Sequence, residues 1–157
     1  MVLSEVFNFV AAVALSGDGT WLAVGTYTAT VWLWHVPDRR LQAVLHGHSA
    51  PALALAFNET GTLLASGSYD GTVRLWDTRT AQTVAIQEGH TGGPRTVALS
   101  RDGRVLASTD HAGTLHLWET TSQRSLAALQ AHTGGPAVVA LSGDGALLVG
   151  LKTLIAH

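Results

Sequence analysis

Three side chains of this sequence belong to the types that a serine hydrolase uses: His48, Ser66 and Asp70. In such an enzyme the histidine takes a proton from the serine hydroxyl, and the carboxylate orients the imidazole ring. The spacing of 18 residues from His48 to Ser66 recurs between His90 and Ser108. This recurrence favours a structural role over catalysis, and it directs attention to the elements that hold these residues.

The stretch of residues 63–77, LLASGSYDGTVRLWD, contains two β-type runs separated by Asp70-Gly71. This dipeptide suits a tight hairpin turn, because glycine adopts positive φ without steric cost. The stretch recurs 42 residues later as VLASTDHAGTLHLWE and 42 residues earlier as WLAVGTYTATVWLWH, so that Trp34, Trp76 and Trp118 are equally spaced. A fixed period of about 40 to 45 residues with a Trp-Asp pair predicts an array of small antiparallel sheets.

Further landmarks keep the same register along the chain. They are Gly47-His48 with Gly89-His90, and the turn glycines Gly19, Gly61, Gly103 and Gly145. With Ser66, Asp70-Gly71, Trp76-Asp77, Ser108 and Trp118-Glu119, the sequence resembles the WD40 repeat family over almost its whole length. This resemblance implies a β-propeller with four strands in each blade.

We therefore predict an all-β fold, a partial WD40-type propeller that forms a single domain over residues 1–157. Three four-stranded antiparallel blades are expected near residues 9–45, 52–87 and 95–129, followed by half of a fourth blade at 137–150. After residue 150 the repeat pattern stops, because LKTLIAH contains no Asp-Gly turn. We expect this chain not to close a ring by itself, and either to belong to a longer propeller or to self-associate.

The resemblance also implies a role for the hydrogen-bonding residues. In the family, these side chains form a buried hydrogen-bonded chain, here His48, Ser66, Asp70 and Trp76, with His90, Ser108 and Trp118 in the next blade. Each buried polar group then has a partner, which fixes one packing. Ala112 occupies the place of the aspartate in the third blade, and Asp110 lies two residues earlier. We expect that network to be incomplete.

Metal, cofactor and catalytic sites are not predicted. The eight histidines include only two close pairs, His46 with His48 and His111 with His116, and no carboxylate cluster lies beside them at ligand spacing. The expected inner strands carry one charge, Arg95, which argues against chemistry in a central channel. The sequence therefore favours a protein that is not an enzyme and uses no metal or cofactor.

Composition agrees with a propeller. Apolar residues make up 46% of the chain and charged residues 13%, where about 25% is usual, because each sheet is covered on both faces. The net charge of −2 implies no general affinity for nucleic acid or membranes. No apolar run reaches the roughly 18 residues that cross a bilayer, and no targeting segment is visible. We expect a cytoplasmic protein.

Function follows from the architecture and the resemblance, since propellers of this family mostly act as rigid platforms for protein partners. We expect a protein–protein interaction scaffold, part of a larger protein. Its candidate contact residues include Tyr27, Tyr69 and His111, which lie at the turns between second and third strands. Arg95, at the start of an inner strand, is expected near the same end of the sheets. A small-molecule-binding or hydrolytic propeller, or a truncated repeat array without independent function, remain alternatives. Trp21 and Trp32, which lie outside the repeated tryptophan, either pack between blades or contact a partner.

Overall fold

The computed structural model describes residues 9–90, 93–130, 138–141 and 147–150. These residues form 14 strands. In chain order the strands are β1 Val10–Leu15, β2 Trp21–Thr26, β3 Val31–His35, β4 Arg40–Leu45, β5 Ala52–Phe57, β6 Leu63–Ser68, β7 Val73–Asp77, β8 Gln82–Gln87, β9 Pro94–Leu99, β10 Val105–Asp110, β11 Thr114–Glu119, β12 Arg124–Gln130, β13 Val138–Leu141 and β14 Leu147–Gly150.

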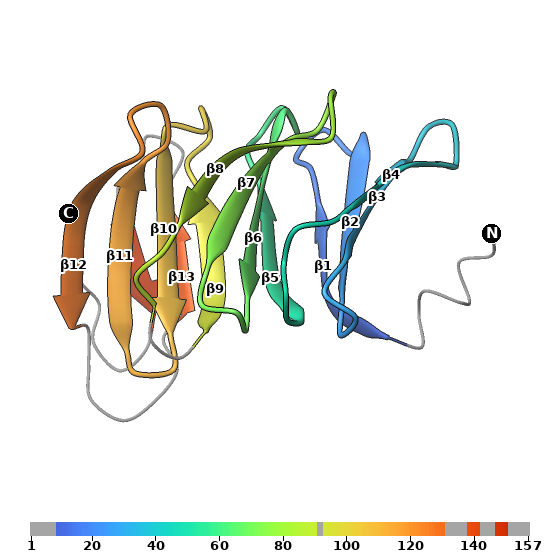
Figure 1. Cartoon of the computed structure of the whole chain (residues 1–157). Coiled ribbons are helices and arrows are strands. Elements are labelled where there is room, and N and C mark those ends of the chain that lie inside the picture. The colour runs from blue at the N-terminus through green and yellow to red at the C-terminus, as the bar shows by residue number, and fades with distance from the viewer. Residues whose placement is uncertain (1–8, 91–92, 131–137, 142–146, 151–157) are drawn as a thin grey trace.

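The strands are grouped into sheets that follow the chain without a crossover. β1–β4, β5–β8 and β9–β12 each form a four-stranded antiparallel sheet, and β13 pairs with β14. The first strand of each sheet contacts the first strand of the next, β1 with β5, β5 with β9 and β9 with β13. Figure 1 shows the sheets standing side by side like the blades of a propeller. The predicted fold class is confirmed; residue 137, the expected beginning of the half blade, lies outside the described residues.

Turn chemistry explains why the sheets form at these places. Gly19, Gly61 and Gly103, between the first and second strands of each sheet, all have φ of 74° to 75°, a region in which other residues are strained. In the next turn, Gly71 and Gly113 also have positive φ. These are glycines of the 42-residue repeat, so the repeat specifies the hairpins locally.

The core lies between neighbouring sheets rather than inside any one of them. Between the first two sheets, Ala23, Val31 and Leu45 of the first pack against Leu64 and Trp76 of the second. The next interface repeats this arrangement, with Ala65, Val73 and Leu75 packed against Leu106 and Trp118. The second sheet therefore buries both of its faces, which accounts for part of the small share of charged residues.

Trp21 and Trp32 have different surroundings. A Cβ atom added to Gly61 would lie 2.7 Å from the Trp21 ring, so Trp21 packs closely against the second sheet. This confirms the prediction of packing between blades for Trp21. Trp32 packs with Val24 and Trp34 on the opposite face of the first sheet, and its Nε1 donates a hydrogen bond to Thr30 Oγ1 at 3.1 Å.

The second strands of the second and third sheets continue two residues beyond the serine of the predicted network. β6 extends to Ser68 and β10 to Asp110. Asp110 therefore ends a strand, two residues before the position that corresponds to Asp70 in the repeat. This placement determines how the third sheet completes its polar network.

Candidate functional site: a buried polar network and an exposed turn face

The second sheet contains a continuous chain of hydrogen bonds. Trp76 Nε1 donates to Ser66 Oγ at 2.8 Å, and Ser66 Oγ lies 2.7 Å from His48 Nε2. His48 Nδ1 lies 3.0 Å from Asp70 Oδ2. A neutral histidine with its proton on Nδ1 satisfies every link, because Ser66 then donates to Nε2 and His48 donates to Asp70. The predicted network of His48, Ser66, Asp70 and Trp76 is therefore present.

Electrostatics support this assignment of protons. Burial lowers the pKa of His48, and the hydrogen bond from Nδ1 to Asp70 only partly offsets that effect. Burial of Asp70 disfavours its ionised form, but hydrogen bonds from Thr72, His48 and the Ser49 N–H outweigh burial and lower the pKa of Asp70 to about 2. His48 is thus neutral and Asp70 ionised at neutral pH, and their contact is a charge-assisted hydrogen bond rather than an ion pair.

The expectation that the third sheet lacks a complete network is wrong. His90 Nε2 lies 2.6 Å from Ser108 Oγ, His90 Nδ1 lies 2.9 Å from Asp110 Oδ2, and Trp118 Nε1 donates to Ser108 Oγ at 3.4 Å. Asp110 takes the role of Asp70 from a different backbone position. In both sheets the carboxylate also accepts a hydrogen bond from the backbone N–H at the start of the third strand, that of Thr72 at 2.8 Å and that of Thr114 at 3.0 Å.

The first sheet has no equivalent network among the described residues. Val24 replaces the serine, and Trp34 Nε1 is buried without a hydrogen-bond partner in the described part of the chain. Thr26, Thr28 and Thr30 instead hydrogen-bond to one another through their hydroxyl groups. In the first sheet, Trp34 therefore contributes packing, and its N–H makes no hydrogen bond with the described residues.

His116 lies beside the network of the third sheet, a position that the sequence analysis did not predict. It is buried, its ring stacks on Trp118 with centroids 5.2 Å apart, and it meets the edge of His90 at 4.5 Å. Burial lowers its pKa, the charge of His90 adds to this, and Asp110 opposes it. His111 lies exposed in the preceding turn, whereas the ring of His116 is buried.

The geometry rules out hydrolysis at these serines. Ser66 and Ser108 have no exposed surface, and each hydroxyl lies within hydrogen-bond distance of a histidine and a tryptophan inside the protein. A nucleophile must reach the carbonyl carbon of its substrate. The His-Ser-Asp arrangement therefore stabilises the blades. Among the described residues, no group of three or more His, Cys, Asp or Glu side chains could hold a metal ion.

Acidification should destabilise the protein through the buried histidines. In the unfolded chain histidine titrates near pH 6.5, whereas burial lowers the pKa of His48 and His116 in the folded state. The unfolded state therefore binds more protons below about pH 6.5, and the free energy of unfolding falls as the pH decreases. Loss of the Asp70 contribution follows between about pH 4 and pH 2.

Urea unfolding at pH 7.5 and pH 5.5 tests this expectation. We expect a lower midpoint at pH 5.5, and a smaller difference between the two pH values in the His116→Gln variant. His46→Asn, which changes an exposed histidine, is the matched control and should retain the wild-type difference. Equal midpoints for the wild-type protein at both pH values would contradict the expectation.

The predicted contact residues lie on the surface at one end of the sheets. Tyr27 and Tyr69 are 60% and 58% exposed, and His111 and Arg95 are also exposed. Hydrogen bonds hold the backbone at both tyrosines in place. Tyr27 N donates to Phe9 O, and Tyr69 N donates to Pro51 O. Phe9, which sequence analysis did not select, is 52% exposed beside Tyr27. These residues define the turn face.

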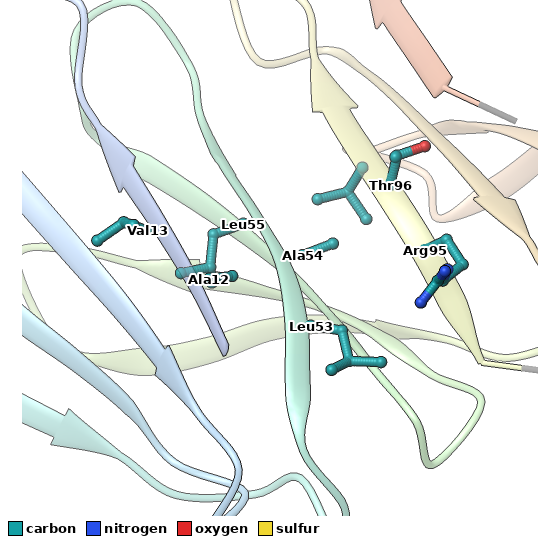
Figure 2. A pocket seen from close by; sticks show the side chains of 8 residues that line it. Ala12, Val13, Leu53, Ala54, Leu55, Arg95 and Thr96 are labelled. Carbon is teal, nitrogen blue, oxygen red and sulfur yellow. The ribbon is translucent and has the colours of Figure 1, made fainter. Parts of the chain in front are cut away.

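The turn face adjoins a hollow in front of the inner strands. The hollow has a volume of about 300 Å³ and is lined by residues of β1, β5 and β9: Ala12, Val13, Leu53, Ala54, Leu55, Arg95, Thr96 and Val97. Figure 2 shows Leu53 on β5 and Arg95 on β9 near the beginnings of their strands, with Ala12 and Val13 on β1 across from them. All lining residues except Arg95 are uncharged.

The fold and the repeated network define this chain as a WD40 propeller module. The family description WD domain, G-beta repeat, matches residues 5–35, 39–77 and 81–119, which is more than half of the chain. The chain belongs to this family. The matches cover three copies of the repeat, in agreement with the resemblance noted from the sequence.

Solved structures show the same fold. U3-55K and the RRP9 WD40 repeats each superimpose with a TM-score of 0.82 at 19% sequence identity. Both alignments cover 94% of this chain, and they cover 51% and 50% of the matched chains. This chain therefore spans about half the length of these structures. No curated protein sequence matches it.

Proposed function

We propose that this chain is a protein-interaction scaffold that binds its partner through the turn face. WD40 propellers generally bind proteins and are generally not catalytic. The observation that carries the proposal is the position of Tyr27 and Tyr69 at equivalent places in consecutive sheets, each more than half exposed on the same face. Tyrosine is enriched at protein interfaces, because its ring provides a large contact area and its hydroxyl a hydrogen bond.

The alternatives have less support. A hydrolytic propeller would need an accessible nucleophile, and Ser66 and Ser108 are buried. The described residues contain no helix long and apolar enough to cross a membrane. The cytoplasmic location and the absence of nucleic-acid binding stay predictions from the sequence.

Site-specific photo-crosslinking tests the proposed face. A photoreactive amino acid at position 69 should crosslink one partner in cells, whereas the same group at Thr60 should not. Thr60 is the matched control, because it is exposed in the same sheet but lies in the turn at the opposite end of β6. Against the isolated partner, Tyr69→Ala should weaken binding at least tenfold, as expected for an aromatic hot spot. Equal crosslinking at both positions would refute the proposal.

We further propose that the outer face of the first sheet binds a second copy of the chain. On this face Val13 and Leu15 are 59% and 64% exposed, whereas Val97 and Leu99, the residues 84 positions later in the repeat, are each 8% exposed against the preceding sheet. The same positions are thus covered wherever a neighbouring sheet is present. A sheet from a second copy of the chain would therefore fit against Val13 and Leu15 in the same way.

Light scattering during size-exclusion chromatography tests self-association. The apparent mass of the wild-type chain should rise with concentration above the 16.4 kDa of one chain. The double variant Val13→Asp with Leu15→Asp should remain monomeric and folded, because both side chains are largely exposed in the monomer. A wild-type mass of one chain at all concentrations would show that this face does not associate.

A further inference from the structure

Three inner strands, β1, β5 and β9, contain a β-bulge at the same position of the repeat. The register shifts between Val10 and Ala12 in β1 and between Ala52 and Ala54 in β5. In the third sheet, Thr96 pairs with Thr109 and Pro94 with Asp110, so one residue is again left over. The unpaired residues are Ala11, Leu53 and Arg95. A bulge redirects the side chain of its extra residue, and bulges are common beside binding sites.

Arg95, at the bulge of β9, is the one charged side chain among the described residues that line the hollow. The inner strands read VAAVAL, ALALAF and PRTVAL, so neither an acidic residue nor a second basic residue lies on them. Arg95 is exposed and takes part in none of the ion pairs found among the described residues. Its guanidinium therefore lies beside an apolar surface of leucine, valine and alanine, without an acidic partner within the described chain.

We propose that this hollow binds a carboxylate that is adjacent to an apolar side chain, in an extended segment of the protein partner. One guanidinium balances the single charge of an aspartate or glutamate and can hold its two oxygens with two parallel hydrogen bonds. The neighbouring apolar side chain covers Leu53, the half-buried bulge residue of β5 that lines the hollow. Exclusion of water by this contact strengthens the pairing with Arg95.

The inference rests on the proposed function, and it specifies the chemistry of the partner segment that the chain binds. A phosphate group would fit less well, because it carries nearly two negative charges and the inner strands offer one positive charge. A volume of about 300 Å³ suits one or two side chains of a peptide and lies at the lower limit for a small-molecule site.

Selection of random heptapeptides on the immobilised chain tests the inference. Peptides selected on the wild-type chain should be enriched in Asp or Glu next to Leu, Ile, Val or Phe. Peptides selected on the Arg95→Glu variant should instead carry Lys or Arg at the acidic position. Arg104→Glu, which reverses an exposed charge in the turn before β10, is the matched control and should select the same acidic peptides as the wild type.

Affinities of one selected peptide complete the test. Arg95→Gln, and replacement of the peptide acid by its amide, should each weaken binding at least tenfold. Together they should weaken it little further, because both remove the same contact. Melting curves should show that Arg95→Gln leaves the fold intact.

The outcomes separate this inference from the proposed function. Peptides that depend on Tyr69 but not on Arg95, or that carry no acidic residue, overturn the inference and leave the turn face in place as the interaction surface. Failure to select any peptide also overturns it, and the crosslinking experiment then decides about the turn face independently. Peptides insensitive to both Tyr69→Ala and Arg95→Gln count against both proposals.

Discussion

Replacing Trp76 with alanine should lower the free energy of unfolding by roughly 3 to 5 kcal/mol, the range measured for large aromatic residues truncated in cores. Trp76 is 2% exposed and packs against Ala23, Val31 and Leu45 of the preceding sheet. Its removal leaves a cavity between two sheets and deprives Ser66 of a hydrogen bond. Urea unfolding followed by circular dichroism measures the effect.

Two conservative variants separate packing from hydrogen bonding. Trp76→Phe keeps most of the ring but removes the N–H donor to Ser66, and should cost about 1 to 3 kcal/mol. Trp34→Phe is the matched control in the first sheet, where Nε1 has no partner among the described residues. It should cost less, because no hydrogen bond is lost. An equal loss for the two variants would show that the network around Ser66 contributes nothing beyond packing.

The second large effect is expected at Asp110. Its side chain is 1% exposed, and it provides the hydrogen-bond acceptor for His90. Asp110→Ala should lower the free energy of unfolding by about 3 kcal/mol, at the upper end of the cost of leaving buried hydrogen-bonding groups without a partner. Asp70→Ala should cost less, about 1 to 3 kcal/mol, because the Asp70 side chain is 9% exposed and water can reach its partners.

The control for Asp110 moves the aspartate of the third sheet to the position that Asp70 occupies in the second sheet. In the register of the repeat, Asp110 corresponds to Ser68 and Ala112 to Asp70. Asp110→Ser alone should destabilise the protein, and adding Ala112→Asp should restore most of the loss. Glu88→Ala, which removes an exposed carboxylate in the loop before β9, is the control and should have little effect. A double variant no more stable than Asp110→Ser would show that the two backbone positions are not interchangeable.

Much of the fold could be predicted from local patterns. The 42-residue spacing of Trp34, Trp76 and Trp118, with glycine turns at a constant register, predicted the number of strands and their grouping into sheets. This is possible because hairpin turns and alternating burial depend on residues that are close in the chain. The network of His48 was implied by the family resemblance, and the structure places its members together.

Three features depended on contacts between distant segments. Asp110 reaches His90, which lies 20 residues earlier, because β10 continues two residues beyond Ser108 and ends where the carboxylate faces the imidazole. The bulges at Leu53 and Arg95 follow from the pairing of β5 with β6 and β9 with β10. The exposure of Leu15, against the burial of Leu99, follows from which face has a neighbouring sheet. Side chains bond and pack within a few ångströms, so their partners are fixed only when strand register and sheet packing are complete.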